Sequence, residues 1–386
     1  MSSICKLING VKAAFLMVMV QVAYAVCTIL YKLVEKNNGM SLCVLLAYRY
    51  IFASIFMVPL AYFAERKNKP KITAKVLFQA FLCGLFGATL QQNLYVEAVI
   101  LSGVTYATVM YNFIPGATFI LAVCFGLERL NIGTLTGKAK VIGTIMGISG
   151  AMVLTFYKSI EIHLWSTNVN LLKHHLQPQN VSSNNIWGSS LALGTCLSYS
   201  IWLIIQARMS EKFPWHYTST ALMSVMASIQ STIFALCMER GDWNQWKLGW
   251  DIKLFTALFA GIVVSGINWV LISWCVRIKG PLYASVFNPL FLVLVAIGGS
   301  LLLDEKLYLG SVIGSVIIVI GLYIVLWGKS KELKKVIEQN QVKESVEIQP
   351  MEIITTKLED AKNIETDNND IKSSGFKEIT IKNYET

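Results

Sequence analysis

The sequence predicts an all-α membrane protein of ten transmembrane helices, arranged as two similar five-helix halves. The first observation is composition: 54% of the 386 residues are hydrophobic and 15% are charged, whereas charged residues make up about 25% of a typical soluble domain. The second is a set of ten apolar runs near the ~20 residues that a membrane-spanning helix needs. The third is an internal repeat, in which short motifs of the first half recur in the second half at a nearly constant offset.

Each apolar run is expected to be a helix, because hydrocarbon offers no partner to an unpaired backbone group. A membrane barrel would instead show alternating strands of ~10 residues. In chain order the predicted spans are 11–31, 41–63, 74–98, 104–126, 138–157, 186–207, 216–238, 254–276, 281–303 and 308–328. The first span also has a signal-peptide-like site at Ala23-Tyr24-Ala25. Cleavage there is disfavoured, because Tyr199 repeats Tyr24 after 175 positions and its span would lose its counterpart.

Three motifs define the repeat. Residues 103–109 (GVTYATV) return at 280–286 (GPLYASV), residues 141–143 (VIG) return at 312–314, and residues 53–55 (ASI) return at 227–229. Because each half holds an odd number of spans, the second copy must cross the membrane in the opposite sense. Inverted repeats of this kind are frequent in secondary transporters, whose substrate site lies near the midplane between the halves.

The predicted organisation has five parts: a cytosolic N-terminus (1–10), the first repeat (11–157), an extracytoplasmic linker (158–185), the second repeat (186–328) and a disordered cytosolic tail (329–386). Loops on one side of the predicted membrane carry 18 Lys and Arg residues and those on the other carry 8. The positive-inside rule therefore places both termini in the cytosol. The linker contains a glycosylation sequon at Asn180. Basic residues flank the spans, where lipid headgroups favour them, so the net charge of +10 does not indicate nucleic-acid binding.

Several motifs stand out along the chain: Tyr48-Arg49-Tyr50, Asn112-Phe113-Ile114-Pro115, Gly249-Trp250-Asp251, Ser265-Gly266-Ile267, Gly280-Pro281, Phe287-Asn288-Pro289-Leu290 and the run 305–314. These motifs resemble those of plant drug/metabolite transporters of the EamA type, in particular the Walls Are Thin-related proteins (nodulin-21-like, UMAMIT). The resemblance covers nearly all of 11–330. It implies two inverted five-helix EamA-like repeats and transport of small organic solutes, with amino acids and auxin-related metabolites as the known classes. Glu97 departs from the family's pattern.

Charged and amide side chains inside the spans are the candidate binding residues, because a charge in the hydrocarbon costs roughly 2.5–3.5 kcal/mol. Arg49 could anchor a substrate carboxylate or hold the bundle together through backbone carbonyls. Its repeat counterpart is Met223, so the charge is not a symmetric structural requirement. The candidate substrate-binding residues are Arg49, Gln21, Gln92, Asn93, Asn112, Asn268 and Asn288. The amides could equally tie helices together.

Two further roles are predicted inside the spans. Burial favours the neutral form of a carboxyl group, so Glu97 is a candidate proton carrier, unless it is solvated at the span end. Pro115 and Pro289 occupy spans four and nine and would each free a backbone carbonyl, which makes them candidate hinges or simple packing kinks. Small-xxx-small patterns at Gly143 and Gly310 predict close packing of spans five and ten, or a homodimer surface.

The sequence favours a transporter over an enzyme. The four histidines lie in the predicted linker or at a span edge, and no metal-ligand, Walker or dinucleotide-binding motif is present, so no catalytic residue, metal or cofactor is expected. The predicted function is alternating-access transport of a small organic solute, an amino acid or a related and auxin-like metabolite. Protons are a candidate coupling ion, and the plasma membrane or the vacuolar membrane is the expected location. The alternative is a membrane-anchored receptor or scaffold that acts through its loops and tail.

Overall fold

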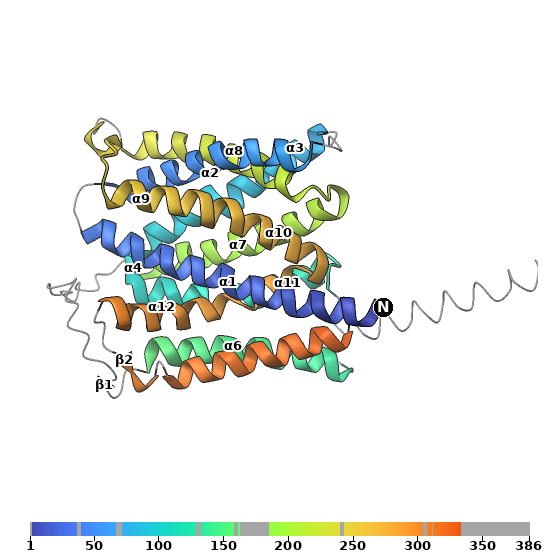
Figure 1. The fold of residues 1–386 in the computed structure, drawn as a ribbon. Coiled ribbons are helices and arrows are strands. Elements are labelled where there is room, and N and C mark those ends of the chain that lie inside the picture. The colour runs from blue at the N-terminus through green and yellow to red at the C-terminus, as the bar shows by residue number, and fades with distance from the viewer. Residues whose placement is uncertain are drawn as a thin grey trace, which may run out of the picture. The chain divides into compact units, whose positions relative to one another are not determined.

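A computed structural model describes residues 2–36, 40–66, 72–128, 133–157, 161–162, 185–239, 243–303, 307–310 and 312–332. Most of the predicted linker, including Asn180, and the tail from residue 333 lie outside these residues. The chain divides into two compact units, Met1–Lys329 and Ser330–Thr386. The first unit contains the bundle of helices described below (Figure 1).

Helices make up almost all of the described chain. The first half contains α1 (Ser2–Lys36), α2 (Leu42–Ala64), α3 (Ala74–Gly84), the π-helix η1 (Leu85–Thr89), α4 (Leu90–Tyr111), α5 (Ile114–Cys124) and α6 (Leu135–Phe156). The second half contains α7 (Asn185–Lys212), α8 (His216–Met238), the 3-10 helix η2 (Trp243–Trp246), α9 (Ile252–Phe259), the π-helix η3 (Ala260–Ile267), α10 (Asn268–Lys279), α11 (Pro281–Ser285) and α12 (Asn288–Leu303). A last helix covers Val312–Glu332. Two short strands, β1 (Glu161–Ile162) and β2 (Leu307–Tyr308), pair antiparallel.

Local side chains fix where several helices begin. The hydroxyls of Ser41, Thr73 and Thr134 and the carboxylate of Asp251 each accept a backbone N–H at the start of α2, α3, α6 and α9. These are N-caps, which satisfy donors that the first helical turn leaves free. At the end of α10, Gly280 has a φ of 89°, a conformation that glycine adopts without steric cost.

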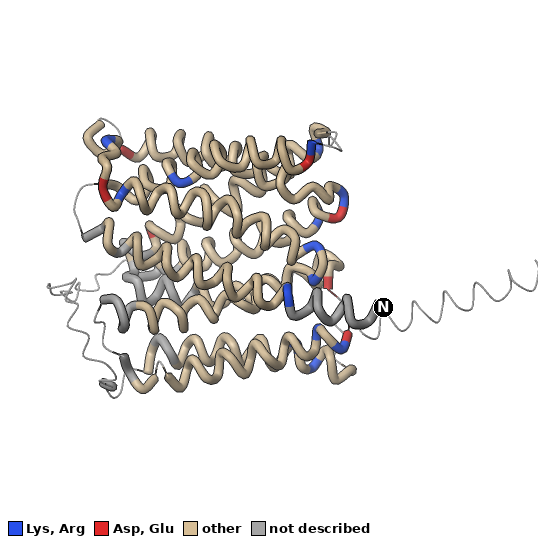
Figure 2. The backbone as a smooth tube through the Cα atoms, in the orientation of Figure 1, with Lys and Arg blue, Asp and Glu red and all other residues tan. Residues whose placement is uncertain are grey.

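Eight helices of the described chain are long and apolar enough to cross a membrane. They correspond to eight of the ten predicted spans, and Figure 2 shows most charged residues near the two ends of the helices. The predicted fifth span appears as α6, a 22-residue helix. The boundary expected between spans three and four, at 98–104, is wrong, because α4 continues to Tyr111 and the helical path is interrupted at Asn112 and Phe113 instead.

The internal repeat is visible in the backbone. The two π-helices η1 and η3 begin at Leu85 and Ala260, 175 positions apart. Each packs on the second span of the other half, η1 on α8 and η3 on α2. At both crossings a glycine contacts the same position of the second span: a Cβ on Gly84 would lie 3.0 Å from the backbone N of Ala227, and one on Gly261 would lie 3.1 Å from that of Ala53, the repeat counterpart of Ala227.

Glycines also join α6 to the last helix, as the small-xxx-small patterns predict. A Cβ placed on Gly321 would lie 2.7 Å from the backbone N of Gly147, and one on Gly143 would lie 2.7 Å from the carbonyl oxygen of Gly321. No side chain fits at such distances, so the absence of Cβ atoms sets the approach of the two backbones. Spans five and ten therefore form a pair, at one edge of the bundle in Figure 1.

A buried ion cluster ties three segments of the first unit together. Glu128, which follows α5, accepts Lys140 Nζ of α6 at 2.5 Å on one oxygen and Lys329 Nζ of the last helix at 2.5 Å on the other. All three residues are at most 8% exposed. A carboxylate shared by two ammonium groups offsets much of the cost of burying them, and removing it would leave two buried cations unpaired.

Candidate functional site

Arg49 is the buried charge around which the candidate site is built. It lies in α2 where that helix crosses η3, and it is 3% exposed. Its Nε donates to Ser265 Oγ of η3 at 2.7 Å and its Nη1 donates to the Tyr31 hydroxyl of α1 at 3.2 Å. Its guanidinium also lies 5.3 Å from the centre of the Tyr50 ring, a cation–π distance.

No carboxylate of the described chain is paired with Arg49. Its printed partners are neutral hydroxyls and an aromatic ring, in contrast to the two lysines that share Glu128. A buried cation normally has an anionic partner, because desolvation of an unpaired charge is costly. The guanidinium can donate five hydrogen bonds in a planar fork, so it retains the capacity to bind an incoming anion.

Aromatic rings connect Arg49 to the amides of α1 and α12. Tyr50 stacks on Trp269 with centroids 5.7 Å apart, Trp269 lies 6.1 Å from Trp202, and Trp202 lies 5.1 Å from Tyr199. The Tyr199 side chain lies beside Asn288. The row contains residues of α2, α7 and α10, so both halves contribute to it.

The amides at the far end of this row are buried and incompletely satisfied. Gln21 Nε2 donates to Asn288 Oδ1 at a long 3.4 Å, and both residues are at most 6% exposed. The Asn288 Nδ2 and the Tyr50 hydroxyl are buried without a hydrogen-bond partner. Buried polar atoms are nearly always paired, so these two are free to hydrogen-bond a solute or water.

We call this group the central site; it comprises Arg49, Tyr31, Tyr50, Ser265, Trp269, Trp202, Tyr199, Asn288 and Gln21. Of the residues predicted from the sequence, Arg49, Gln21 and Asn288 belong to it. Asn268 is buried nearby in α10, where its Nδ2 donates to the Val20 carbonyl at 3.4 Å. Tyr31, Ser265 and the aromatic row were not predicted as site residues, although the repeat of Tyr24 at Tyr199 was a signal for one of them.

Asn112 and the two prolines lie at helix interruptions. Asn112 is buried in the turn between α4 and α5, and its Nδ2 has no hydrogen-bond partner. Pro115 is the second residue of α5 and Pro289 the second residue of α12, and each follows a two-residue turn. The kinks predicted inside spans four and nine are therefore full helix breaks at the same position of each repeat. Proline is tolerated there because the first helical residues have no intrahelical acceptor for their N–H groups.

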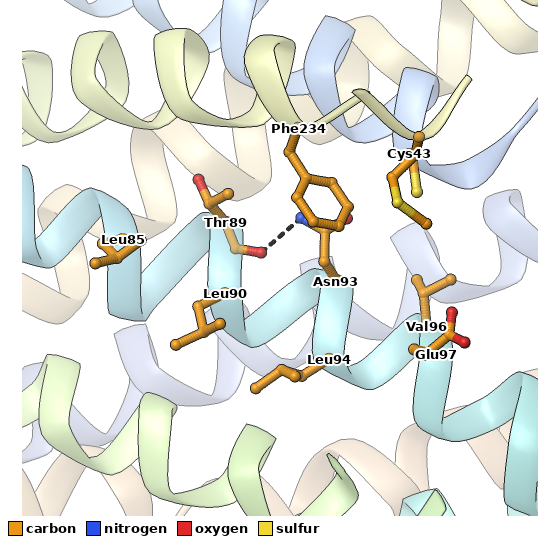
Figure 3. A pocket seen from close by; sticks show the side chains of 10 residues that line it. Cys43, Leu85, Thr89, Leu90, Asn93, Leu94, Val96, Glu97 and Phe234 are labelled. Atoms are coloured by element: carbon orange, nitrogen blue, oxygen red, sulfur yellow. Dashed lines mark hydrogen bonds between the residues drawn. The ribbon is translucent and has the colours of Figure 1, made fainter. Parts of the chain in front are cut away.

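Asn93 and Glu97 lie elsewhere, in a cavity of about 280 Å³ between α4, α2 and α8 (Figure 3). Glu97 is exposed and Gln92 half-buried. The burial on which a proton-carrying role for Glu97 depended is therefore not observed. Asn93 Nδ2 donates to the Thr89 carbonyl at 2.6 Å, and its Oδ1 has no partner.

The fold and the central site define a class of protein: a multi-pass membrane protein with two repeated halves that share a buried polar site. The family model of EamA-like transporters matches residues 11–156 and 186–327. Among curated proteins of Arabidopsis thaliana, WAT1-related protein At1g25270 is 42% identical over 84% of this chain and 91% of its own length, and WAT1-related protein At1g68170 is 39% identical over 89% and 98%. A crystal structure of a protein 15% identical superposes with a TM-score of 0.62 over 81% of this chain and 98% of that one, a likeness of fold.

The chain belongs to the EamA-like transporter family and, within it, is similar to the plant WAT1-related proteins. It is a multi-pass membrane transporter of small solutes, as its sequence motifs predicted. The match in two segments also confirms the prediction of two EamA-like repeats.

Proposed function

We propose that the chain carries small organic acids, amino acids or related and auxin-like metabolites, across the membrane by alternating access between its two halves. The observation that carries the proposal is Arg49, a buried cation with no carboxylate partner in the described chain. A solute carboxylate would form charge-assisted hydrogen bonds with its guanidinium. The unpartnered Tyr50 hydroxyl and Asn288 Nδ2 would bind the solute's other polar groups.

The aromatic row favours a solute with an apolar portion. Its rings lie between Arg49 at one end and the Gln21–Asn288 pair at the other. Aromatic side chains provide large contact areas with specific geometry, and ligand sites combine such surfaces with a few convergent polar groups. An amphipathic acid fits both parts of the central site.

Rocking of the halves would use the helix breaks before Pro115 and Pro289 as flex points. Each break lies beside a member of the site or an unsatisfied amide, Asn288 in α12 and Asn112 before α5. Rigid pairs such as α6 with the last helix would move as units. We propose that both termini are cytosolic, because the basic loops favour that orientation. The plasma membrane or the vacuolar membrane is the proposed location.

The test is uptake of labelled amino acids and indole-3-acetate into proteoliposomes, with and without an imposed proton gradient. Flux that follows the gradient would establish coupling, and Glu97→Gln would then test whether this residue carries the proton. Flux that ignores the gradient would establish a facilitator. Absence of flux for every carboxylate would contradict the proposal and favour a receptor or scaffold.

A further inference from the structure

The cavity between α4, α2 and α8 is separate from the central site and has a different chemistry. Its ten lining residues are Cys43, Leu85, Thr89, Leu90, Asn93, Leu94, Val96, Glu97, Phe234 and Met238. Most are apolar, and among these described residues none is Lys or Arg. Arg49, by contrast, makes the central site cationic. The two sites therefore favour ligands of opposite charge.

The cavity follows from the way the helices pair. η1 packs on α8, where the Thr89 hydroxyl lies 3.0 Å from that of Ser231. Beyond that contact α4 packs mainly on α7, and α8 packs mainly on α2. α4 and α8 therefore separate on the side of Glu97, and a π-helical turn such as η1 commonly accompanies a change of helix direction.

Polar groups of one kind are found in this opening. The Asn93 side chain lines the cavity (Figure 3), and its Oδ1 is buried without a partner. The Glu97 carboxylate lies one helical turn further along α4. The Asn93 Oδ1 and the Glu97 carboxylate oxygens are hydrogen-bond acceptors, and the carboxylate is anionic.

The fold does not require these groups. The repeat counterpart of Glu97, 175 positions later, is Ile272, a core residue 1% exposed. The counterpart of Asn93 is Asn268, whose amide is tied to the Val20 carbonyl of α1. The second half thus builds the same helix with an apolar residue and a bonded amide, whereas the first half presents a carboxylate and an unpaired amide oxygen.

We propose that this cavity is a second binding site, which takes a small amine with an apolar body. The ammonium group would lie between Glu97 and the Asn93 Oδ1, and the apolar body would lie against Leu90, Leu94 and Phe234. An apolar cavity of about 150 Å³ holds benzene, so about 280 Å³ accommodates an aromatic ring with a two- or three-atom arm. An arylalkylamine has this size and charge.

The test uses the full chain in phosphatidylcholine nanodiscs and titrates 2-phenylethylamine by calorimetry. We expect saturable binding of the amine, and weak or no binding of 2-phenylethanol, which has the same shape without the charge. Glu97→Gln should weaken amine binding by about ten-fold or more, the effect of losing a hydrogen bond to a charged group. Glu211→Gln is the matched control, because its carboxylate is exposed in a pair with Arg208, and it should leave binding unchanged.

A second variant tests the cavity rather than the charge. Leu90→Trp should fill the space and abolish amine binding, with folding checked by gel filtration and circular dichroism. Equal binding of the alcohol and the amine, or unchanged binding by both Glu97→Gln and Leu90→Trp, would overturn the proposal. Displacement of the amine by added phosphatidylethanolamine would support ammonium recognition with a lipid headgroup as its source, and no displacement would support a free amine.

Binding of the amine in this cavity should not depend on the central site. Arg49→Met should leave amine binding unchanged, because Arg49 does not line the cavity. Amine binding without any carboxylate flux would uphold this site and reject the proposed function. Carboxylate flux without amine binding would do the reverse.

Discussion

Replacing Arg49 by Met tests the central site with little expected damage to the fold. Met223 occupies the equivalent position of the second half, where α8 crosses η1, and it is 2% exposed. The repeat therefore already contains a methionine at such a crossing, with its sulfur 3.3 Å from Trp202 Nε1. Arg49→Met gives the first half the residue type that the second half uses.

The expected magnitudes differ for stability and for transport. The variant loses the bonds to Ser265 and Tyr31, but it also removes a desolvated cation with no carboxylate partner in the described chain. Replacement of buried charges by apolar residues of similar size is often neutral or stabilising, so unfolding should change by no more than about 2 kcal/mol. Loss of a charge-assisted bond to a carboxylate should cost ~1.5–3 kcal/mol of solute binding, or roughly 10–150-fold in affinity.

The assay is the initial rate of solute uptake into proteoliposomes as a function of concentration. The solute is the carboxylate that the wild-type protein carries best. Arg49→Met should raise the half-saturating concentration roughly 10–150-fold. The half-saturating concentration of Arg49→Lys should lie between those of the wild type and Arg49→Met, because an ammonium keeps the charge but not the planar fork. Ser265→Ala is the matched control: it removes the 2.7 Å bond to Arg49 and keeps the charge, so its effect should be smaller.

A folded Arg49→Met protein that transports carboxylates with unchanged half-saturation would show that Arg49 is a structural residue. Asn288→Ala examines the other end of the aromatic row, where Nδ2 has no partner. If neither variant altered flux, the central site would not be the substrate site. Thermal unfolding in detergent distinguishes these results from simple misfolding.

The remaining predictions concern stability, measured by thermal unfolding in detergent. Glu128→Gln should destabilise the protein by about 3–5 kcal/mol, because two buried ammonium groups lose their shared carboxylate; Glu211→Gln, at an exposed pair, should cost less than about 1 kcal/mol. Gly321→Ala should cost about 1–3 kcal/mol, because the new Cβ would lie 2.7 Å from a backbone nitrogen. Gly147→Ala, where nothing lies within 4 Å of the added Cβ, should be neutral or slightly stabilising. Equal effects of the two glycine variants would contradict the close helix pairing.

The sequence was sufficient for those features that one segment or one repeat determines. Apolar length predicted eight of the ten spans as the structure has them, and the glycine spacing predicted the pairing of α6 with the last helix. The proline positions predicted both helix interruptions. The sequence-based prediction of the boundary between spans three and four, near residue 100, was wrong. Gly103 does not interrupt α4, whereas Gly280 of the equivalent motif ends α10 with a positive φ.

Contacts between distant segments could not be predicted in the same way. Ser265 lies 216 positions from Arg49, and the two meet only because η3 packs across α2. The sequence left open whether Glu97 is buried or solvated at the end of its span. Its exposure follows from α4 packing mainly on α7 and α8 packing mainly on α2. Which helices pack together is a property of the assembled bundle, and no local sequence pattern predicts it.

The two halves share their backbone features and differ in their polar residues. The π-helices and the proline breaks recur at equivalent positions, and at each crossing a glycine contacts the equivalent alanine of a second span. The repeat counterparts of Arg49 and Glu97 are Met223 and Ile272, which are uncharged. Asn93 differs from its counterpart Asn268 in its hydrogen bonding. Symmetric halves suit a mechanism in which they exchange conformations, but an organic solute has no matching symmetry. Its charged end must be bound by one half, so the residues that break the repeat are the first ones to mutate in a search for the substrate.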